Sequence, residues 1–146
     1  MKKFAFALSL AAIAATVSFA GPMEDREVVM KGMGKLVYGA LPPIVKGEKP
    51  FDAAEANAVF AEVNKIAMTI DIAALFPEGS NTGESTASSK IWEDMAGFTA
   101  AMDKFKAEAA AAVAANPQDF EAFKTQFGAL VGSCNACHET FRIKKG

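Results

Sequence analysis

Hydrophobic side chains recur every three or four residues along most of the chain, in four stretches separated by turn-forming segments. The stretches cover about 22–40, 52–76, 94–115 and 117–141, and none alternates hydrophobic and polar residues as a half-buried strand would. Residues three or four apart share one face of an α-helix, whereas strands repeat every two residues. The pattern therefore predicts an all-α protein made of four amphipathic helices.

Turn signals between the stretches predict how these helices begin and how they are joined. Asp52 is expected to cap the second helix, and Asn116 and Pro117 are expected to open the fourth as its N-cap and first helical residue. Residues 78–90 are rich in Gly, Ser, Thr and Asn, which indicates one long loop. Because the other connections are short, neighbouring helices are expected to run antiparallel in a four-helix bundle.

The last helix carries the most continuous hydrophobic seam of the chain. Its positions follow one another in steps of three and four residues, sustained over about three heptads. They are Phe120, Phe123, Phe127, Leu130, Cys134, Cys137 and Phe141. Both cysteines of the chain are therefore expected on the inner face of the bundle, among aromatic side chains.

Residues 1–20 have the features of a secretory signal peptide. Two lysines give a positively charged start, an apolar run follows, and residues 18–20 form a small-x-small cleavage site. The apolar run is too short to span a bilayer, so no stable membrane anchor is expected. Residues 21–146 are then expected to form a single domain in the periplasm.

Composition argues against several classes of function. The whole chain has a formal net charge of −2, and removal of the signal segment with its two lysines makes the exported chain more acidic. Nucleic-acid binding, which favours a basic stripe, is therefore not expected. The chain has a single histidine and no recognisable Ser/His/Asp set, so we do not expect an enzyme.

The segment Cys134-Asn135-Ala136-Cys137-His138 has the C-x-x-C-H pattern of covalent haem attachment. Two residues three apart on a helix share a face and lie about 4.5 Å apart along its axis. Two thiols in that arrangement can add to the two vinyl groups of one porphyrin. His138 follows beside the same face, so the sequence predicts one haem c with His138 as an axial ligand of its iron.

Other readings of the two cysteines are a disulfide, a dithiol redox pair, half of a zinc site, or coincidence. A disulfide between residues three apart would close a very short loop and add little stability. A thioredoxin-like motif needs a βαβ context, and a zinc site needs a further cysteine or histidine unless a carboxylate serves. Placement on a phenylalanine-lined seam favours haem attachment over these alternatives.

His138 is the only histidine in the chain, so two histidines of one subunit cannot both bind the iron. The second axial position is left to methionine, a less usual ligand, water or nothing. The methionines after the signal segment are Met23, Met30, Met33, Met68, Met95 and Met102. Met30 and Met33 lie on the expected inner face of the first helix, and the hydrophobic pattern does not separate them.

Four features resemble the class II c-type cytochromes, the cytochrome c′ family, over nearly all of residues 21–146. They are Arg26 four residues before Met30, Pro43-x-x-Lys46-Gly47 followed by Pro50-Phe51-Asp52-Ala53-Ala54, Ile91-Trp92 after the long loop, and the C-x-x-C-H segment followed by Phe141-Arg142. The last feature is the most specific. The resemblance implies a left-handed antiparallel four-helix bundle with haem near the C-terminus of the last helix.

The resemblance also separates the two candidate methionines. In cytochromes c′ the side chain four residues after the arginine is typically apolar and leaves the iron five-coordinate, whereas in the cytochrome c-556 type it is a methionine that binds iron. Met30 occupies that position. The chain therefore resembles the low-spin cytochrome c-556 branch, which implies Met30 as the sixth ligand and Met33 as a core residue.

Further residues match family positions around the haem. Arg26 is implied to lie against a haem propionate, with a solvated salt bridge to Glu24 or Glu27 as the alternative. Arg142 resembles the family residue beside the proximal imidazole, and a cation at a helix C-terminus is the alternative. Trp92 and Phe127 are expected either to line the haem or to pack in the core.

With His138 and Met30 both bound to iron, no position is left for a substrate. We therefore expect an electron carrier that exchanges single electrons with other periplasmic redox proteins. The alternative is a five-coordinate cytochrome c′-like protein that binds nitric oxide or carbon monoxide, and a third class is a structural or metal-holding bundle. Relatives of this type often form homodimers through their first two helices, which this sequence neither favours nor opposes.

Overall fold

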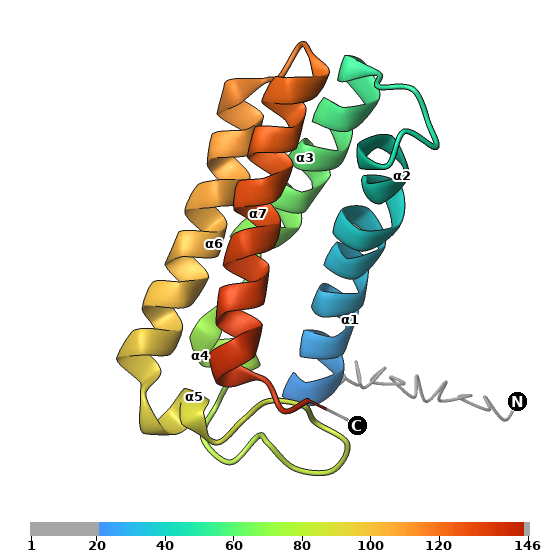
Figure 1. Cartoon of the computed structure of the whole chain (residues 1–146). Coiled ribbons are helices and arrows are strands. Elements are labelled where there is room, and N and C mark those ends of the chain that lie inside the picture. The colour runs from blue at the N-terminus through green and yellow to red at the C-terminus, as the bar shows by residue number, and fades with distance from the viewer. Residues whose placement is uncertain (1–20, 145–146) are drawn as a thin grey trace, which may run out of the picture.

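Four long helical segments run side by side in the computed structural model, which describes residues 21–144 (Figure 1). The predicted signal segment, residues 1–20, lies outside the described residues. The first long segment comprises α1 (Pro22–Gly34), η1 (Lys35–Ala40) and α2 (Pro42–Val45), and the others are α3 (Ala53–Met68), α6 (Met95–Ala115) and α7 (Phe120–Phe141). Within residues 21–144 there is no strand beyond an isolated bridge, so the predicted all-α bundle is confirmed.

One end of the bundle holds most of its irregular structure. The short helices α4 (Ile72–Leu75) and α5 (Lys90–Glu93) lie there, joined by a long loop, residues 76–89. The start of α1 and the C-terminal end of α7 reach the same end, as Figure 1 shows. None of the described helices combines the length and the hydrophobicity needed to cross a membrane.

The first helical segment is less regular than its sequence pattern predicts. It is α-helical to Gly34, continues as the π-helix η1, and resumes as α2 at Pro42. Pro42 and Pro43 have no backbone N–H to donate to the preceding turn, so the α-helical bonding cannot continue through them. The chain instead uses the prolines as the first residues of a new helix, where a missing N–H costs little.

The second helix is shorter than expected, because it ends at Met68 and does not continue to residue 76. Thr69 follows as its C-cap, and the Asp71 side chain then accepts a hydrogen bond of 3.1 Å from the backbone N–H of Ala74, which starts α4. Aspartate competes for local backbone donors in this way and favours helix starts. The spacing of hydrophobic residues alone did not predict this break.

The predicted start of the last helix is also wrong. Asn116 does not cap it but ends α6, in a left-handed conformation with φ of 41°. The N-cap of α7 is Asp119, whose Oδ1 accepts a hydrogen bond of 2.8 Å from the N–H of Ala122. Asparagine tolerates the left-handed region better than most residues, so it suits a helix end as well as a start.

Two groups of phenylalanines fill the core. Phe123 of α7 is fully buried and contacts Phe51 and Phe60, with ring centroids 5.5 Å and 5.8 Å apart. At the irregular end, Phe98 lies 4.7 Å from Phe76 and 5.3 Å from Phe141, both in edge-on geometry. These clusters fix α7 against its neighbours on either side of the two cysteines.

The helix start at Asp119 gives a direct test of this fold. We expect Asp119→Ala to lower the free energy of unfolding by about 1 kcal/mol, because the N–H of Ala122 loses its acceptor. Asp103→Ala, which removes an exposed carboxylate inside α6, is the matched control and is expected to change it by less than about 0.5 kcal/mol. Urea unfolding of the haem-loaded protein measures both, and equal effects would contradict the assignment.

Candidate haem site

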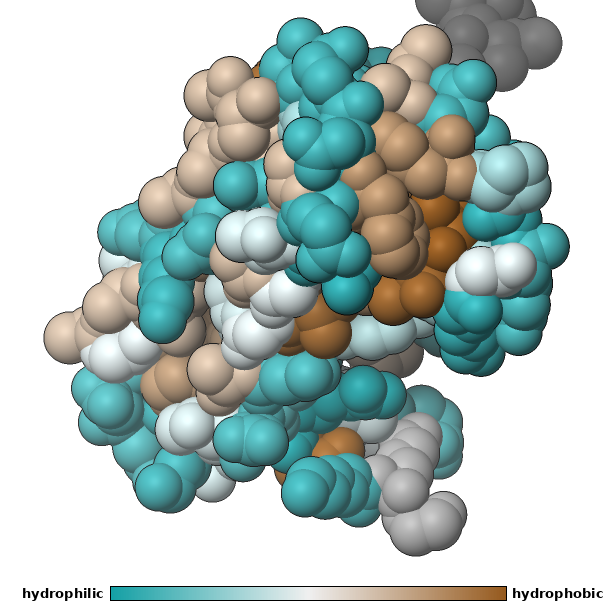
Figure 2. Space-filling view, turned by 45° about the horizontal axis from the view of Figure 1, so that its top comes forward, coloured by the Kyte–Doolittle hydropathy of each residue, from teal (hydrophilic) through white to brown (hydrophobic). Residues whose placement is uncertain are grey.

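A cavity of about 1020 Å³ opens between α1, the long loop and the C-terminal half of α7. Its volume is at the upper end of the ~300–1,000 Å³ typical of small-molecule sites. A smaller cavity of about 70 Å³ lies between α1, η1, α6 and α7, and shares residues with the larger one. On the face shown in Figure 2, hydrophobic side chains reach the surface in a patch edged by hydrophilic ones, so the hydrophobic interior is not fully enclosed.

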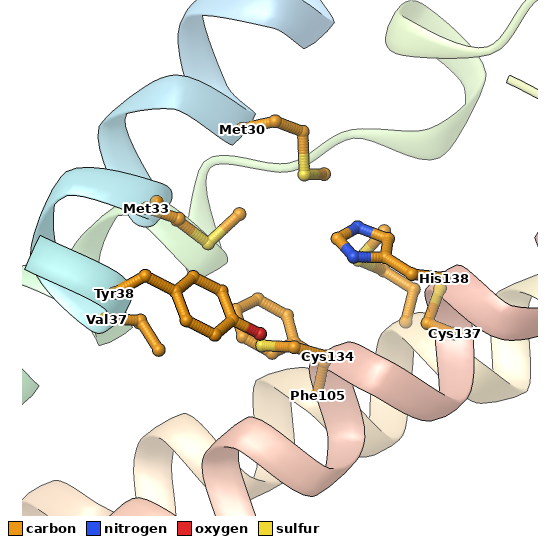
Figure 3. Close-up of a pocket in the computed structure, with 10 residues that line it drawn as sticks. Met30, Met33, Val37, Tyr38, Phe105, Cys134, Cys137 and His138 are labelled. Atoms are coloured by element: carbon orange, nitrogen blue, oxygen red, sulfur yellow. The ribbon is translucent and has the colours of Figure 1, made fainter. Parts of the chain in front are cut away.

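Helix α7 brings Cys134, Cys137 and His138 together at this site. Their spacing of three and four residues puts them on neighbouring positions of one helix face, and all three line the smaller cavity (Figure 3). Both cysteines are half-buried and free, so the disulfide reading does not describe this structure. The seam residues Phe123, Leu130 and Phe141 of the same helix are buried, whereas Phe120, Phe127 and the two cysteines are only partly buried.

Burial controls the protonation of both thiols. It raises the pKa of Cys134 to about 11, with a further contribution from Cys137, and it raises the pKa of Cys137 as well. Both side chains are therefore thiols at neutral pH in the chain without haem. Redox-active and metal-binding cysteines have the opposite property, a lowered pKa that favours the thiolate. This environment argues against a dithiol redox pair.

His138 is held in its neutral form. Burial lowers the pKa of its imidazole, and the positive charge of Arg142 lowers it further. A neutral imidazole has a nitrogen lone pair available to a metal. Arg142 itself is exposed just after the end of α7, where its backbone N–H donates to His138 O at 3.2 Å, and its side chain acts on the imidazole through its charge.

Helix α1 contributes methionines from the opposite side of the site. Met30 is half-buried and lines both cavities, whereas Met33 is 7% exposed and lines only the smaller one. In Figure 3 the Met30 side chain extends from α1 toward the space that His138 faces from α7. The geometry thus distinguishes the two methionines that the hydrophobic pattern left equivalent.

Gly34 leaves space on the α1 side of the site. It lies four residues after Met30, lines both cavities, and a Cβ added there would meet no atom within 4 Å. A side chain at this position would therefore project into the open volume. A large, mainly hydrophobic cavity with thiols and an imidazole on one side and a thioether on the other fits a haem.

Arg26 is bound to the long loop and does not pair with an acid of its own helix. It is 6% exposed, and its Nη1 donates to Leu75 O and Ser80 Oγ, both at 2.8 Å. Its Nη2 donates to Ser80 O at 2.6 Å and to Ser85 Oγ at 3.3 Å. The guanidinium also lies 5.1 Å from the centroid of the Phe76 ring.

The alternatives considered for Arg26 therefore need revision. Glu27 forms an ion pair of 2.7 Å with Lys31, and Glu24 acts on Arg26 only by raising its pKa against the larger lowering effect of burial. Arg26 also lines the larger cavity. Contact with a haem propionate stays a prediction, and attachment of the loop is a role that sequence reasoning missed, because its partners lie 49 to 59 residues away.

Other contacts around the site were also missed. The hydroxyl of Tyr38 donates a hydrogen bond of 3.2 Å to Oδ1 of Asn135, which lies between the two cysteines. Neither Trp92 nor Phe127 lines either cavity. The indole N–H of Trp92 instead donates to the backbone carbonyls of Phe76 and Pro77, at 3.1 Å each.

The chain is similar to known proteins in both sequence and structure. A sequence model of the family described as Cytochrome C' matches residues 21–142. The chain belongs to the cytochrome c′ family. It is 40% identical over 132 residues to a cytochrome c-556 of Agrobacterium fabrum (strain C58 / ATCC 33970), covering 90% of this chain and 88% of that protein. A cytochrome c′ structure from Rhodopseudomonas palustris superposes with a TM-score of 0.79 at 32% identity, over 88% of this chain and all of the other.

Members of the cytochrome c′ family bind haem covalently. This protein is therefore a c-type cytochrome with covalently attached haem and its iron. The cytochrome c′-like four-helix bundle predicted from the sequence is likewise confirmed. The similar structures also include a nitric oxide complex of a variant cytochrome c prime from Alcaligenes xylosoxidans. Its TM-score is 0.73 at 31% identity, over 87% of this chain and 99% of the other.

The hydrogen bonds of Arg26 predict a large contribution to the stability of this cytochrome. We expect Arg26→Gln to lower the free energy of unfolding by about 2–3 kcal/mol, because several partly buried acceptors lose a charged donor. Lys31→Gln breaks an exposed ion pair one turn further along α1 and is expected to cost less than about 1 kcal/mol. Denaturant unfolding of both variants checks this, and a similarly small loss for Arg26→Gln would contradict the loop attachment.

Proposed function

We propose that this cytochrome is a low-spin electron carrier in which His138 and Met30 bind the iron of a haem attached to Cys134 and Cys137. The observation that carries the proposal is that Met30 and His138 line the same cavity from two facing helices, α1 and α7. The two cysteines are the only ones in the chain. Its similarity to cytochrome c-556 of Agrobacterium supports the methionine-ligated branch.

The haem iron supplies a one-electron couple between its ferric and ferrous states. In the proposed site, His138 and Met30 would both bind the iron, so neither a substrate nor a small gas would find a free position on the metal. Met33, Met102 and Phe105 line the smaller cavity with hydrophobic side chains, which disfavour water there. A methionine ligand and a hydrophobic surrounding both favour the reduced state and raise the reduction potential.

The proposed location is the periplasm, and the proposed partners are periplasmic redox proteins. The signal peptide predicted at residues 1–20 supports this location. Haem attachment to a C-x-x-C-H segment suits exported proteins, since thioether bonds are stable in an oxidising compartment where free thiols are not. A homodimer through the first two helices remains a prediction from the family resemblance.

A second candidate function is the binding of nitric oxide or carbon monoxide at an open iron position. The nitric oxide complex of the cytochrome c prime from Alcaligenes xylosoxidans favours it. Met30 is only half-buried and lines a wide cavity, so a gas could displace it without repacking the core. The two functions differ in whether the sulfur of Met30 stays on the iron.

Met30→Leu tests the proposal, because leucine has nearly the same volume and no sulfur. We expect the wild type to show the sharp, split visible bands of a six-coordinate ferrous haem and a ferric sulfur-to-iron charge-transfer band. Met30→Leu is expected to lose that band and to give a broad high-spin spectrum. Optical spectroscopy of the purified holoprotein in both oxidation states measures the change.

Met33→Leu is the matched control, since it removes a thioether from the same helix one turn away. It is expected to keep the wild-type spectrum in both oxidation states. A high-spin wild-type spectrum would favour gas binding and contradict the carrier. Loss of the charge-transfer band in Met33→Leu and not in Met30→Leu would show that the wrong methionine has been assigned.

A further inference from the structure

The Tyr38–Asn135 hydrogen bond joins the first helical segment to the haem-attachment segment. Its two residues are 97 positions apart in the chain, and the donor–acceptor distance is 3.2 Å. Both residues line the larger cavity, at the edge where η1 approaches α7. Tyr38 is the only tyrosine in the chain and is 51% exposed, so its ring is not a core residue. Packing in the core therefore does not account for its position.

The helix that carries Met30 is fastened on both sides of this residue. On one side, Arg26 binds the long loop and the end of α4 through partly buried hydrogen bonds. On the other side, Tyr38 binds Asn135 of α7. Met30 lies four residues after the first attachment and eight before the second. Its position relative to His138 therefore depends on both attachments.

The second attachment lies in the least regular part of this helical segment. Tyr38 belongs to the π-helix η1, which is followed by Pro42 and Pro43. A π-helix has a wider turn than an α-helix and is frequent at functional sites. Met30, Gly34 and Tyr38 are spaced four apart and all line the larger cavity, so they form one row facing it. A displacement of Tyr38 would therefore be transmitted along this row to Met30.

Gly34, at the centre of this row, offers no side chain to hold the separation between the two helices. An added Cβ there would contact nothing within 4 Å. The separation must then be set at the ends of the row. At the Met30 end, the cavity lies between the row and His138 of α7, whereas at the other end Tyr38 contacts α7 through its hydrogen bond to Asn135.

We propose that Tyr38 is a positioning residue, whose hydrogen bond to Asn135 holds α1 at the separation from α7 at which Met30 reaches the iron. This inference rests on the proposed function, and adds a residue that controls how firmly Met30 is bound. Without the bond, α1 samples wider separations, and the state in which Met30 has left the iron gains population. Small gases bind iron only in that state, so their apparent affinity reports the population.

The expected effect is modest because the bond is neutral and partly exposed to solvent. A net contribution of this kind shifts an equilibrium by about 2- to 10-fold. Tyr38→Phe keeps the ring and removes the hydroxyl, and Asn135→Leu keeps the size and removes the acceptor. Each change should raise the apparent affinity of the ferrous protein for carbon monoxide by about 2- to 10-fold.

The experiment compares the wild type, Tyr38→Phe, Asn135→Leu and the double variant, all as holoproteins with one haem per chain. The double variant is expected to match each single variant, because all three lack the same bond. Thr125→Val is the control, since the Thr125 hydroxyl bonds only to Glu121 O within α7. It is expected to leave carbon monoxide affinity unchanged. Asn135→Ala replaces Asn135→Leu if leucine reduces haem attachment.

Hydrogen exchange of the η1 amides gives a readout that does not use the haem iron. Exchange across Lys35–Ala40 is expected to be faster in Tyr38→Phe and in Asn135→Leu, with α3 unchanged. A low-spin wild type whose carbon monoxide affinity is unaltered by Tyr38→Phe would overturn the positioning role and leave the electron carrier intact. A high-spin wild type would overturn the proposed function and, with it, the role of Tyr38 in methionine binding.

Discussion

The structure depends on a hydrophobic seam of α7 that is covered along most of its length and left open at the cysteines. Phe123 and Leu130 are buried before the opening, and Phe141 is buried after it. The opening exposes hydrophobic surface beside a large cavity, which is unfavourable for the polypeptide alone. In the proposed site haem fills this space, which couples haem binding to folding thermodynamically. On this proposal, the bundle has one region whose stability depends on its cofactor.

The hydrogen bonds that attach α1 to the loop and to α7 are also a consequence of the cavity. A helix that borders a cavity cannot be held by side-chain packing across it, so hydrogen bonds near its two ends add to the core packing of its buried residues Met33 and Val37. Arg26 reaches the long loop, which the C-terminal segment fixes in turn, since the N–H of Ile143 donates to Thr86 O at 2.8 Å and that of Ser88 to Phe141 O at 3.0 Å. Tyr38 reaches α7. In the proposed site, whether Met30 stays on the iron then depends on small movements of one helix.

The sequence was sufficient for the fold and for the residues that meet at the site, and insufficient for the contacts that hold them. Helical period and the C-x-x-C-H spacing are local properties, so they predicted the bundle and the shared position of Cys134, Cys137 and His138. The end of α6 at Asn116 depends on a left-handed backbone conformation, and the start of α4 at Asp71 depends on a single side-chain hydrogen bond, and neither follows from the hydrophobic period. The partners of Arg26 and Tyr38 lie tens of residues away, and no spacing rule links them.

The central claim is that a sulfur from α1 and a nitrogen from α7 bind the same iron. X-ray absorption at the iron edge of the wild-type holoprotein tests this most directly, since sulfur and nitrogen neighbours scatter differently. The account predicts one sulfur neighbour in addition to nitrogen ligands, and its loss in Met30→Leu. A wild-type spectrum with nitrogen or oxygen neighbours alone would contradict the account.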